Sequence, residues 1–324
     1  MLDGATVVDM HVHGPGLVPR LYAAAYRVGY RAISGQAVPP AEGFDVLGAS
    51  GVDLVVAKAV GDPVVTRWYR GRGWEAVEKQ LARLEVELSA AGVELGRGAL
   101  LGVEGGDTLE STEHVDTWHA RGVRVVTIVH LSDNRLGRTC MPWQQFVARW
   151  VPVGRRGVDG LTGLGRAVVQ RMQQLGMLVD VAHCDRRTLL DTVEVAEAPV
   201  ASTHTGARAL QPEFPRFLSD EELRAIASTG GVVGLWPYFS RGRGVPDMGE
   251  LVAHARYIAD LVGVEHLCLG TDMNGVPGTA AGYRGERDVP AVAQALRDAG
   301  FAPAEVAAVM GANAVRVLGL WPVR

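Results

Sequence analysis

Several side chains that can bind metal ions or transfer protons stand directly after short apolar runs in this sequence. The first run supplies two of them and five later runs supply one each: His11, His13, Glu104, His130, His183, His204 and Asp272. One histidine in such a place is usually a hydrogen-bonded core residue, but five together are hard to explain in that way. Imidazole nitrogens and carboxylate oxygens are common ligands of catalytic Zn²⁺, so the set predicts a metal centre.

The spacing and surroundings of these residues indicate how they would act. His11 and His13 are two residues apart, so on an extended chain both imidazoles point the same way and can reach one ion. Glu104 precedes two glycines, and burying a lone carboxylate there is costly unless a cation compensates. We therefore expect Glu104 to bridge two divalent ions rather than to pair with an arginine. Asp272 could accept a proton from a water whose pKa two cations lower towards roughly 7, with an Asx-turn role as the alternative.

The apolar runs are the strands that must position these side chains. Most are continuous apolar stretches, as expected for a parallel sheet that is buried on both faces. Amphipathic helical patterns lie between them, for example Glu75–Ala91, Leu164–Leu175 and the segment after the capping box Ser219–Glu222. The expected strands are Thr6–Met10, Asp53–Ala59, Ala99–Glu104, Val123–Val129, Met177–His183, Val200–His204, Gly231–Trp236 and His266–Asp272.

Eight strands alternating with helices, without a linker or an internal repeat, favour a closed barrel over a doubly wound sheet. We predict a single α/β domain over residues 1–324, a (β/α)8 TIM barrel of the metal-dependent hydrolase type. Two long βα loops are expected at about 131–160 and 237–250, and loops of this length usually line or cover a site. They carry arginines that are expected to be mostly solvated: Arg135, Arg138, Arg149, Arg155, Arg156, Arg241 and Arg243.

The composition narrows the function classes. Hydrophobic residues make up 48% and charged residues 21% of the 324, which is typical of a folded globular chain. A formal net charge of −4 gives no indication of a positively charged surface that would bind nucleic acid or an anionic membrane. Neither a signal peptide nor a membrane-length apolar run is recognisable, and three widely spaced cysteines do not favour a disulfide framework. We therefore expect a cytoplasmic protein that binds neither nucleic acid nor membrane, with a homodimer left open.

Seven segments, in their order and spacing, resemble the membrane (renal) dipeptidase family, zinc peptidases of the amidohydrolase superfamily. The resemblance covers nearly the whole chain. It implies a barrel with two divalent metal ions per chain, Zn²⁺, that cleaves dipeptides with a free C-terminal carboxylate. The ligands alone would also admit Mn, Fe or Co, because availability outside the site decides which ion is bound. The segments are Gly102–Gly106, Arg121–His130, Gly160–Arg166, Leu175–His183, Pro199–His204, Leu269–Asp272 and Gly311–Leu318.

The resemblance also implies which residues hold the ions. Glu104 would bridge them, His183 and His204 would hold one ion, and His11 would hold the other. His13 completes the predicted ligand set because of its spacing from His11.

The same resemblance implies roles for the remaining residues. Asp272 would be the catalytic acid/base, and His130 would contact the substrate near the scissile carbonyl. Arg216 would bind the substrate carboxylate after a one-residue shift in register, with Arg208 as the fallback.

The sequence departs from the family pattern at three places. His11-Val-His13 stands where the family has His-x-Asp, and this form resembles lactonases and phosphotriesterases of the wider amidohydrolase superfamily. Asp272-Met-Asn274 stands where the family usually has Asp-x-Asp, and the loop from Leu131 to Gly160 differs strongly. These departures concern the specificity rather than the catalytic core.

Together, the residues and the resemblance predict a metal-dependent dipeptidase or amidase. It would hydrolyse a small, carboxylate-bearing, dipeptide-like amide through a metal-bound hydroxide. The alternative, suggested by His13, is a lactonase, ester hydrolase or cyclic amide hydrolase on the same binuclear site. A non-catalytic barrel that binds a small molecule is a third hypothesis, disfavoured because every expected ligand position except that of His13 keeps the family's residue.

Overall fold

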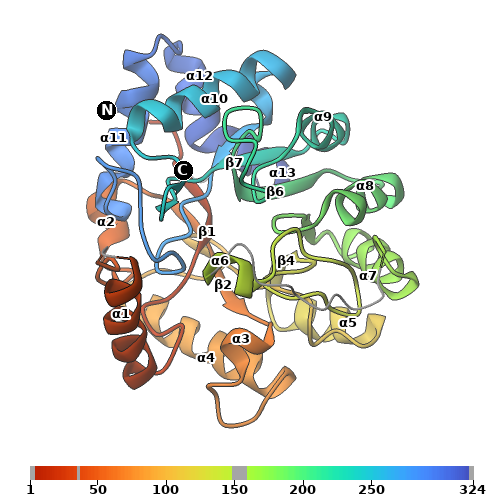
Figure 1. Cartoon of the computed structure of the whole chain (residues 1–324). Helices are drawn as coiled ribbons and strands as arrows, with labels where there is room; N and C mark the ends of the chain where they lie inside the picture. The colour runs from red at the N-terminus through yellow and green to blue at the C-terminus, as the bar shows by residue number, and fades with distance from the viewer. Residues whose placement is uncertain (1–3, 35–36, 148–158, 321–324) are drawn as a thin grey trace.

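Eight parallel strands close into a barrel at the centre of the molecule (Figure 1). The computed structural model describes residues 4–34, 37–147 and 159–320. Neighbours around the barrel follow the order β1-β10-β7-β6-β5-β4-β3-β2, which confirms the predicted (β/α)8 barrel. The barrel strands are β1 Val8–Val12, β2 Leu54–Val60, β3 Ala99–Glu104, β4 Val123–Thr127, β5 Leu178–Asp180, β6 Val200–Thr205, β7 Val232–Leu235 and β10 Leu267–Leu269.

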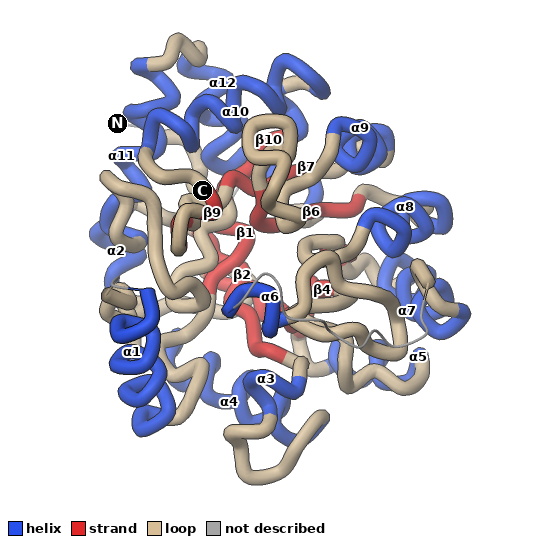
Figure 2. Tube along the Cα trace, viewed as in Figure 1, coloured by secondary structure: helices blue, strands red, loops and turns tan. Residues whose placement is uncertain are grey.

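Helices surround the barrel, as Figure 2 shows in blue around the red strands. The helix after the predicted capping box begins at Asp220, and Ser219 and Glu222 make both of the expected reciprocal contacts. Helix α1 was not predicted from the sequence. The helices are α1 Arg20–Ser34, α2 Val46–Ser50, α3 Pro63–Thr66, α4 Trp74–Ala90, α5 Thr112–Ala120, α6 Trp143–Val147, α7 Gly163–Gln174, α8 Arg186–Val195, α9 Asp220–Ser228, α10 Met248–Val262, α11 Val289–Asp298, α12 Pro303–Ala307 and α13 Asn313–Val317.

The barrel interior is layered from apolar to polar. Its apolar layer draws on every barrel strand and meets Ala314 and Val315 of α13. Above this layer, Lys58 and Asp180 form a fully buried ion pair with Nζ and Oδ2 2.6 Å apart. The apolar layer consists of Val8, Met10, Leu54, Val56, Leu100, Val125, Leu178, Ala201, Val232 and Cys268.

Two strands end three residues earlier than the sequence predicted. β5 ends at Asp180 and β10 ends at Leu269, each three residues before an expected functional side chain. His183 has φ 65° and Asp272 has φ 58°, in the left-handed region that residues with a Cβ adopt only at a cost. The chain therefore leaves the extended conformation before these residues, and the left-handed turns aim both side chains at the barrel mouth.

The two long loops contain more regular structure than expected. The 131–160 connection includes α6, and its residues 148–158, with Arg149, Arg155 and Arg156, lie outside the described residues. The second loop is shorter than 237–250, because α10 begins at Met248. It folds into a hairpin of β8 Phe239–Ser240 and β9 Arg243–Gly244.

Across the described residues, no helix combines the length and the apolar character that spanning a bilayer requires.

Candidate metal centre

All seven side chains singled out from the sequence lie together at the mouth of the barrel, and Glu104 is at their centre. It ends β3, and its carboxylate is 2% exposed. No arginine within the described ranges pairs with it, so the structural alternative of an arginine-paired glutamate does not apply. Its oxygens face five imidazole Nε2 atoms, at 3.4 Å from His11, 3.3 Å from His13, 3.4 Å from His130, 3.2 Å from His183 and 3.5 Å from His204.

Asp272 closes the same cluster from the β10 side. Its Oδ1 lies 3.3 Å from His13 Nε2 and 3.9 Å from His11 Nε2. The backbone N–H of Asp272 donates to the carbonyl of His11 at 2.8 Å, which ties the turn after β10 to the end of β1. Three overlapping groups could each hold an ion: His11 with His13 and Asp272, His11 with Glu104 and His204, and Glu104 with His130 and His183.

The contacts of Nδ1 in His13 and His11 determine how the Nε2 atom of each ring can act. His13 Nδ1 donates to the carbonyl of Lys58 at 2.9 Å, and His11 Nδ1 lies 2.9 Å from Thr203 Oγ1. In a neutral ring that carries its hydrogen on Nδ1, Nε2 directs a lone pair at the carboxylate of Glu104.

Lone pairs facing carboxylate oxygens at this distance need a proton or a cation between them. Glu104 Oε1 and Asp272 Oδ1 are buried and lack a hydrogen-bond partner within the described part of the chain. Buried acceptors of this kind are costly when they are left unsatisfied. The donor set of imidazole nitrogens and carboxylate oxygens therefore fits divalent metal ions such as Zn²⁺.

The pKa shifts agree with a cationic site. Burial lowers the pKa of both His183 and His204 well below the usual value, so their rings are neutral and able to act as ligands. Burial alone would raise the pKa of Glu104, but the interactions of its carboxylate with the imidazoles of His130 and His11 outweigh burial. The pKa of Glu104 therefore lies well below its usual range, and the group is a carboxylate.

A second layer of residues orients the ligands from below. Thr203 Oγ1 donates to Asp180 Oδ2 at 2.8 Å and lies 3.1 Å from His204 Nδ1. Lys58 Nζ holds the same Asp180 oxygen, and its positive charge lowers the pKa of Asp180 against the effect of burial. Such outer partners fix the ring orientation and tautomer of metal-binding histidines. This layer was not predicted from the sequence, although a lysine within the apolar run Asp53–Ala59 was a visible signal.

Asp62 is a further residue that the sequence analysis missed. It follows β2 by two residues, and its Oδ2 accepts a hydrogen bond from His130 Nδ1. Its other oxygen accepts from the backbone N–H of Val64 at 2.6 Å and caps α3. His130 is thus held between two carboxylates, Asp62 on Nδ1 and Glu104 on Nε2. β2, like most other barrel strands, is therefore followed by a side chain that belongs to the candidate site.

A cavity of about 550 Å³ opens above the cluster. His13, Glu104, His130, His183 and Asp272 form its floor. Its walls are mainly aromatic and apolar, and a volume of this size is typical of a small-molecule site. Arg241 of the 237–250 loop also lines the cavity.

The two candidate carboxylate-binding arginines differ in their surroundings. Arg216 is 1% exposed; its Nη2 donates to the His204 carbonyl at 3.0 Å, and its guanidinium stacks over Trp236. Its Nε has no partner within the described ranges, and no carboxylate there pairs with it. Arg208 instead donates to the Phe217 carbonyl and lies 3.4 Å from Glu222. Arg216 therefore has the spare donor next to the metal centre.

Other arginines and histidines of the sequence lie away from the site. Arg138 lies 3.7 Å from Asp185, and Arg243 donates to the Gln145 carbonyl at 2.9 Å. His254 is buried and accepts from the backbone N–H of Ala207, and burial lowers its pKa to about 4. The remaining histidines, His114 and His266, lie within hydrogen-bond distance of the Thr108 and Gly231 carbonyls, and His119 is partly exposed at the end of α5.

Comparison with solved structures finds the same fold in metallopeptidases. A crystal structure titled dipeptidase AC, a metallo peptidase of family M19, matches with a TM-score of 0.73 and 19% identity over 97% of this chain and 98% of that one. A metallo peptidase from Rhodobacter sphaeroides, liganded with a phosphinate mimic of the dipeptide L-Ala-D-Ala, has a TM-score of 0.70 and 19% identity, covering 98% of this chain and 99% of that one. At these identities the likeness concerns the fold.

Sequence comparison adds the family. A dipeptidase from Aspergillus oryzae, aclJ, is 29% identical over 68% of this chain and 51% of its own, and tcpJ from Claviceps purpurea is 28% identical over 68% and 50%. The chain thus spans about half the length of these curated relatives. An uncharacterised protein of the pqqA 5′ region of Klebsiella pneumoniae is 30% identical over 80% of this chain and 97% of that one. The family model for membrane dipeptidase matches residues 76–320, and the chain therefore belongs to the membrane dipeptidase family, peptidase family M19.

Proposed function

We propose that the protein is a metal-dependent dipeptidase that hydrolyses small, carboxylate-bearing, dipeptide-like amides. The observation that carries this proposal is the buried Glu104 carboxylate surrounded by imidazole Nε2 atoms at the floor of a cavity. Family membership and the dipeptidase names of the curated relatives support the choice of bond.

The ligand set proposed for two Zn²⁺ ions is Glu104 as the bridge with His11, His13, His183 and His204. Ions bound there would polarise the scissile carbonyl and lower the pKa of a coordinated water towards roughly 7. The protein itself supplies fixed geometry, since contacts at Nδ1 hold the rings of His11, His13 and His204 in one orientation.

Asp272 is the proposed acid/base. Asp272 lines the cavity, and its Oδ1 is buried and lacks a hydrogen-bond partner within the described residues, so this oxygen can accept a proton. It would take a proton from the attacking water and deliver it to the leaving amine. The left-handed backbone at Asp272 holds this oxygen 3.3 Å from His13 Nε2, beside the proposed metal ligands.

His130 is the proposed substrate contact. Its ring forms part of the cavity floor, and Asp62 holds its Nδ1. Burial lowers the pKa of His130, but the charges of Glu104 and Asp62 outweigh burial and raise it. Because Asp62 fixes the His130 ring before a substrate binds, the ring can orient the scissile carbonyl.

The experiment is a hydrolysis assay of the Zn²⁺-loaded protein with L-Ala-L-Ala, an ester of matched size and a γ-lactone. We expect hydrolysis of the dipeptide that is abolished by a chelator, restored by Zn²⁺ and lost in Asp272→Asn. Preferential hydrolysis of the ester or the lactone would instead support the alternative that His13 suggests. Activity on none of the three would contradict the proposal.

A further inference from the structure

Helix α1 supplies an aromatic wall to the cavity above the metal centre. Tyr22, Tyr26 and Tyr30 are four residues apart, so they share one face of the helix, and all three line the cavity. Their ring centroids are 6.4 Å and 5.8 Å apart in succession. Leu21 and Val28 are 85% and 73% exposed, so α1 turns its tyrosine face towards the cavity and leaves these apolar side chains in solvent.

The facing walls are also aromatic. Trp143 and Phe146 of α6 line the cavity, as do Trp236 and Tyr238 after β7. Trp236 and Tyr238 stack with their centroids 4.2 Å apart and 13° between their planes. The cavity thus presents ring faces and edges from three separate parts of the chain. A bound side chain would meet these rings on more than one side.

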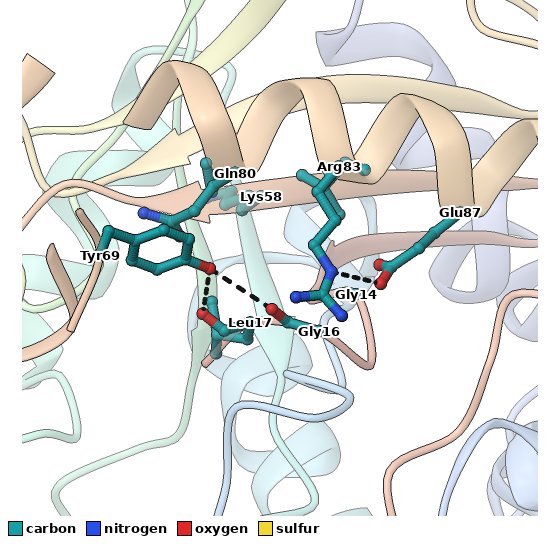
Figure 3. Close-up of a pocket in the computed structure, with 10 residues that line it drawn as sticks. Gly14, Gly16, Leu17, Lys58, Tyr69, Gln80, Arg83 and Glu87 are labelled. Atoms are coloured by element: carbon teal, nitrogen blue, oxygen red, sulfur yellow. Dashed lines mark hydrogen bonds and ion pairs between the residues drawn. The ribbon is translucent and has the colours of Figure 1, made fainter. Parts of the chain in front are cut away.

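The segment that carries α1 is anchored at its beginning. Figure 3 shows the Tyr69 hydroxyl pointing at the chain just before α1, where it donates to the Leu17 carbonyl at 2.8 Å. A Cβ added at Gly16 would meet the Arg83 guanidinium at 2.0 Å, so the chain passes close to α4. Arg83 is in turn held by Glu87 at 2.9 Å. These contacts fix where the helix starts.

The end of α1 that carries Tyr30 is anchored as well. The Tyr30 hydroxyl forms a hydrogen bond with Ser240 of the β8–β9 hairpin. Tyr22 packs on Trp68, with ring centroids 3.9 Å apart, just after α3. The aromatic wall is therefore in place before a substrate binds, which lowers the entropic cost of binding.

We infer that the preferred substrates are dipeptides with a large aromatic side chain, and that Tyr22 and Tyr26 of α1 are the residues that select it. The inference rests on the proposed dipeptidase function and specifies its substrate class. Aromatic side chains bury a large apolar area and gain further from offset or edge-to-face packing on other rings. Because α1 precedes residues 76–320, this wall lies outside the part of the chain that the family model matches.

The test compares kcat/KM for L-Ala-L-Ala, L-Phe-L-Ala, L-Ala-L-Phe and L-Ala-L-Asp in the Zn²⁺-loaded wild type, Tyr22→Ala and Tyr26→Ala. Leu21→Ala and Val28→Ala are matched controls, since both side chains lie on the exposed face of the same helix. Tyr26→Phe keeps the ring and removes only the hydroxyl. Tyr26 is 41% exposed, so its truncation leaves the packed core intact.

We expect the wild type to prefer one of the phenylalanine dipeptides over L-Ala-L-Ala by at least about tenfold in kcat/KM. Tyr22→Ala and Tyr26→Ala should lower kcat/KM for the preferred phenylalanine dipeptide about tenfold more than for L-Ala-L-Ala, and Tyr26→Phe and both controls should keep the wild-type preference. Equal rates on all dipeptides, fastest hydrolysis of L-Ala-L-Asp, or an unchanged preference in both tyrosine variants would overturn the inference alone. Hydrolysis of none of the dipeptides would overturn the proposed function and the inference together.

Discussion

The Nε2 atoms of His183 and His204 lie 3.0 Å apart, and Glu104 Oε1 is 3.2 Å and 3.5 Å from them. Burial keeps both rings neutral, and at this separation only one of the two nitrogens can carry a hydrogen that points at the other. His183 reaches this position only through a left-handed backbone with φ 65°. Local strain of this kind persists where the surrounding structure enforces it, and it is concentrated at functional sites. The pair is therefore best explained as half of a ligand set.

If Glu104 bridges two ions, Glu104→Gln should lower the metal content from two ions per chain to at most one. The amide replaces one carboxylate oxygen with a donor, which cannot bind a cation. The measurement is elemental analysis after Zn²⁺ loading and desalting. Glu113→Gln on the exposed surface of α5 is the control and should keep two ions. Unchanged stoichiometry in Glu104→Gln would contradict the bridging role.

Asp272→Asn should lower turnover by about 10²–10⁴, the usual contribution of general acid/base catalysis. The amide keeps the shape of the side chain but cannot accept and release a proton at Oδ1. Metal content is expected to be largely retained, because the proposed ligand set does not include Asp272. Turnover is measured at saturating dipeptide together with metal content. Turnover close to that of the wild type would reduce Asp272 to a structural turn residue.

Asp62→Asn tests the positioning of His130. Asparagine also caps helices, so the contact with the Val64 N–H and the stability of α3 should be kept. The substitution removes the negative charge that Asp62 places next to His130 Nδ1. Loss of such an outer partner typically costs about 10- to 100-fold in activity. We expect kcat to fall by that factor with the thermal midpoint nearly unchanged. A large loss of stability with normal kcat would assign Asp62 to the helix cap alone.

The fold and the clustering of the candidate ligands were predictable because their signals are local. A continuous apolar run identifies a buried strand, and a histidine or carboxylate at its end is visible beside it. Glu104 and His204, for example, stand at or next to the last residue of their strands in both the prediction and the structure.

The residues that support the site were not predictable in the same way. Asp62, between Gly61 and Pro63, has the local pattern of a helix cap, and its bond to His130 spans 68 residues of sequence. The Lys58–Asp180 pair spans 122. The left-handed turn at His183 has no glycine or asparagine to announce it, so β5 was predicted too long. For α1, the tyrosine spacing was visible in the sequence, but which surface it faces depends on the closed barrel.

Asp107 should make the stability of the protein depend on pH. Its partly buried surroundings, and then the nearby charge of Asp62, raise the pKa of its carboxyl from 3.8 to about 7. Folding therefore favours the protonated form of Asp107. The contribution of this group to the free energy of unfolding is fully present below about pH 4 and is lost as pH rises towards about 7. Each pKa unit corresponds to about 1.4 kcal/mol, and partial exposure reduces the total to on the order of 2 kcal/mol.

Asp107→Asn removes this titration while an amide can still bond with Ser132 and Asn134. Urea unfolding of both proteins at pH 5 and pH 8 measures the difference. The variant should gain stability relative to the wild type at pH 8 compared with pH 5. A difference between the two proteins that does not change with pH would show that Asp107 is ionised at both values.

The last prediction concerns the charge of the substrate. Arg216 is buried beside His204, with a guanidinium Nε that has no partner within the described residues. Burial lowers the pKa of Arg216, which indicates an environment where a carboxylate partner would stabilise the charge. A guanidinium can bind a carboxylate through two parallel hydrogen bonds, and lysine cannot reproduce that geometry. We therefore expect a dipeptide to be hydrolysed faster than its C-terminal amide.

The measurement is kcat/KM for L-Ala-L-Ala and for L-Ala-L-Ala amide in wild type, Arg216→Ala and Arg216→Lys. Losing a charge-assisted pair should cost about 1.5–3 kcal/mol for the acid and little for the amide. Arg216→Lys should recover only part of the loss, because it restores the charge without the planar fork. Arg208→Ala tests the alternative carboxylate-binding residue. It should not change the preference for the acid, since Arg208 already contacts Glu222 and the Phe217 carbonyl. Equal wild-type rates on the acid and the amide would show that the carboxylate is not recognised, and the substitution at His13 would then be the better guide to the bond that is cleaved.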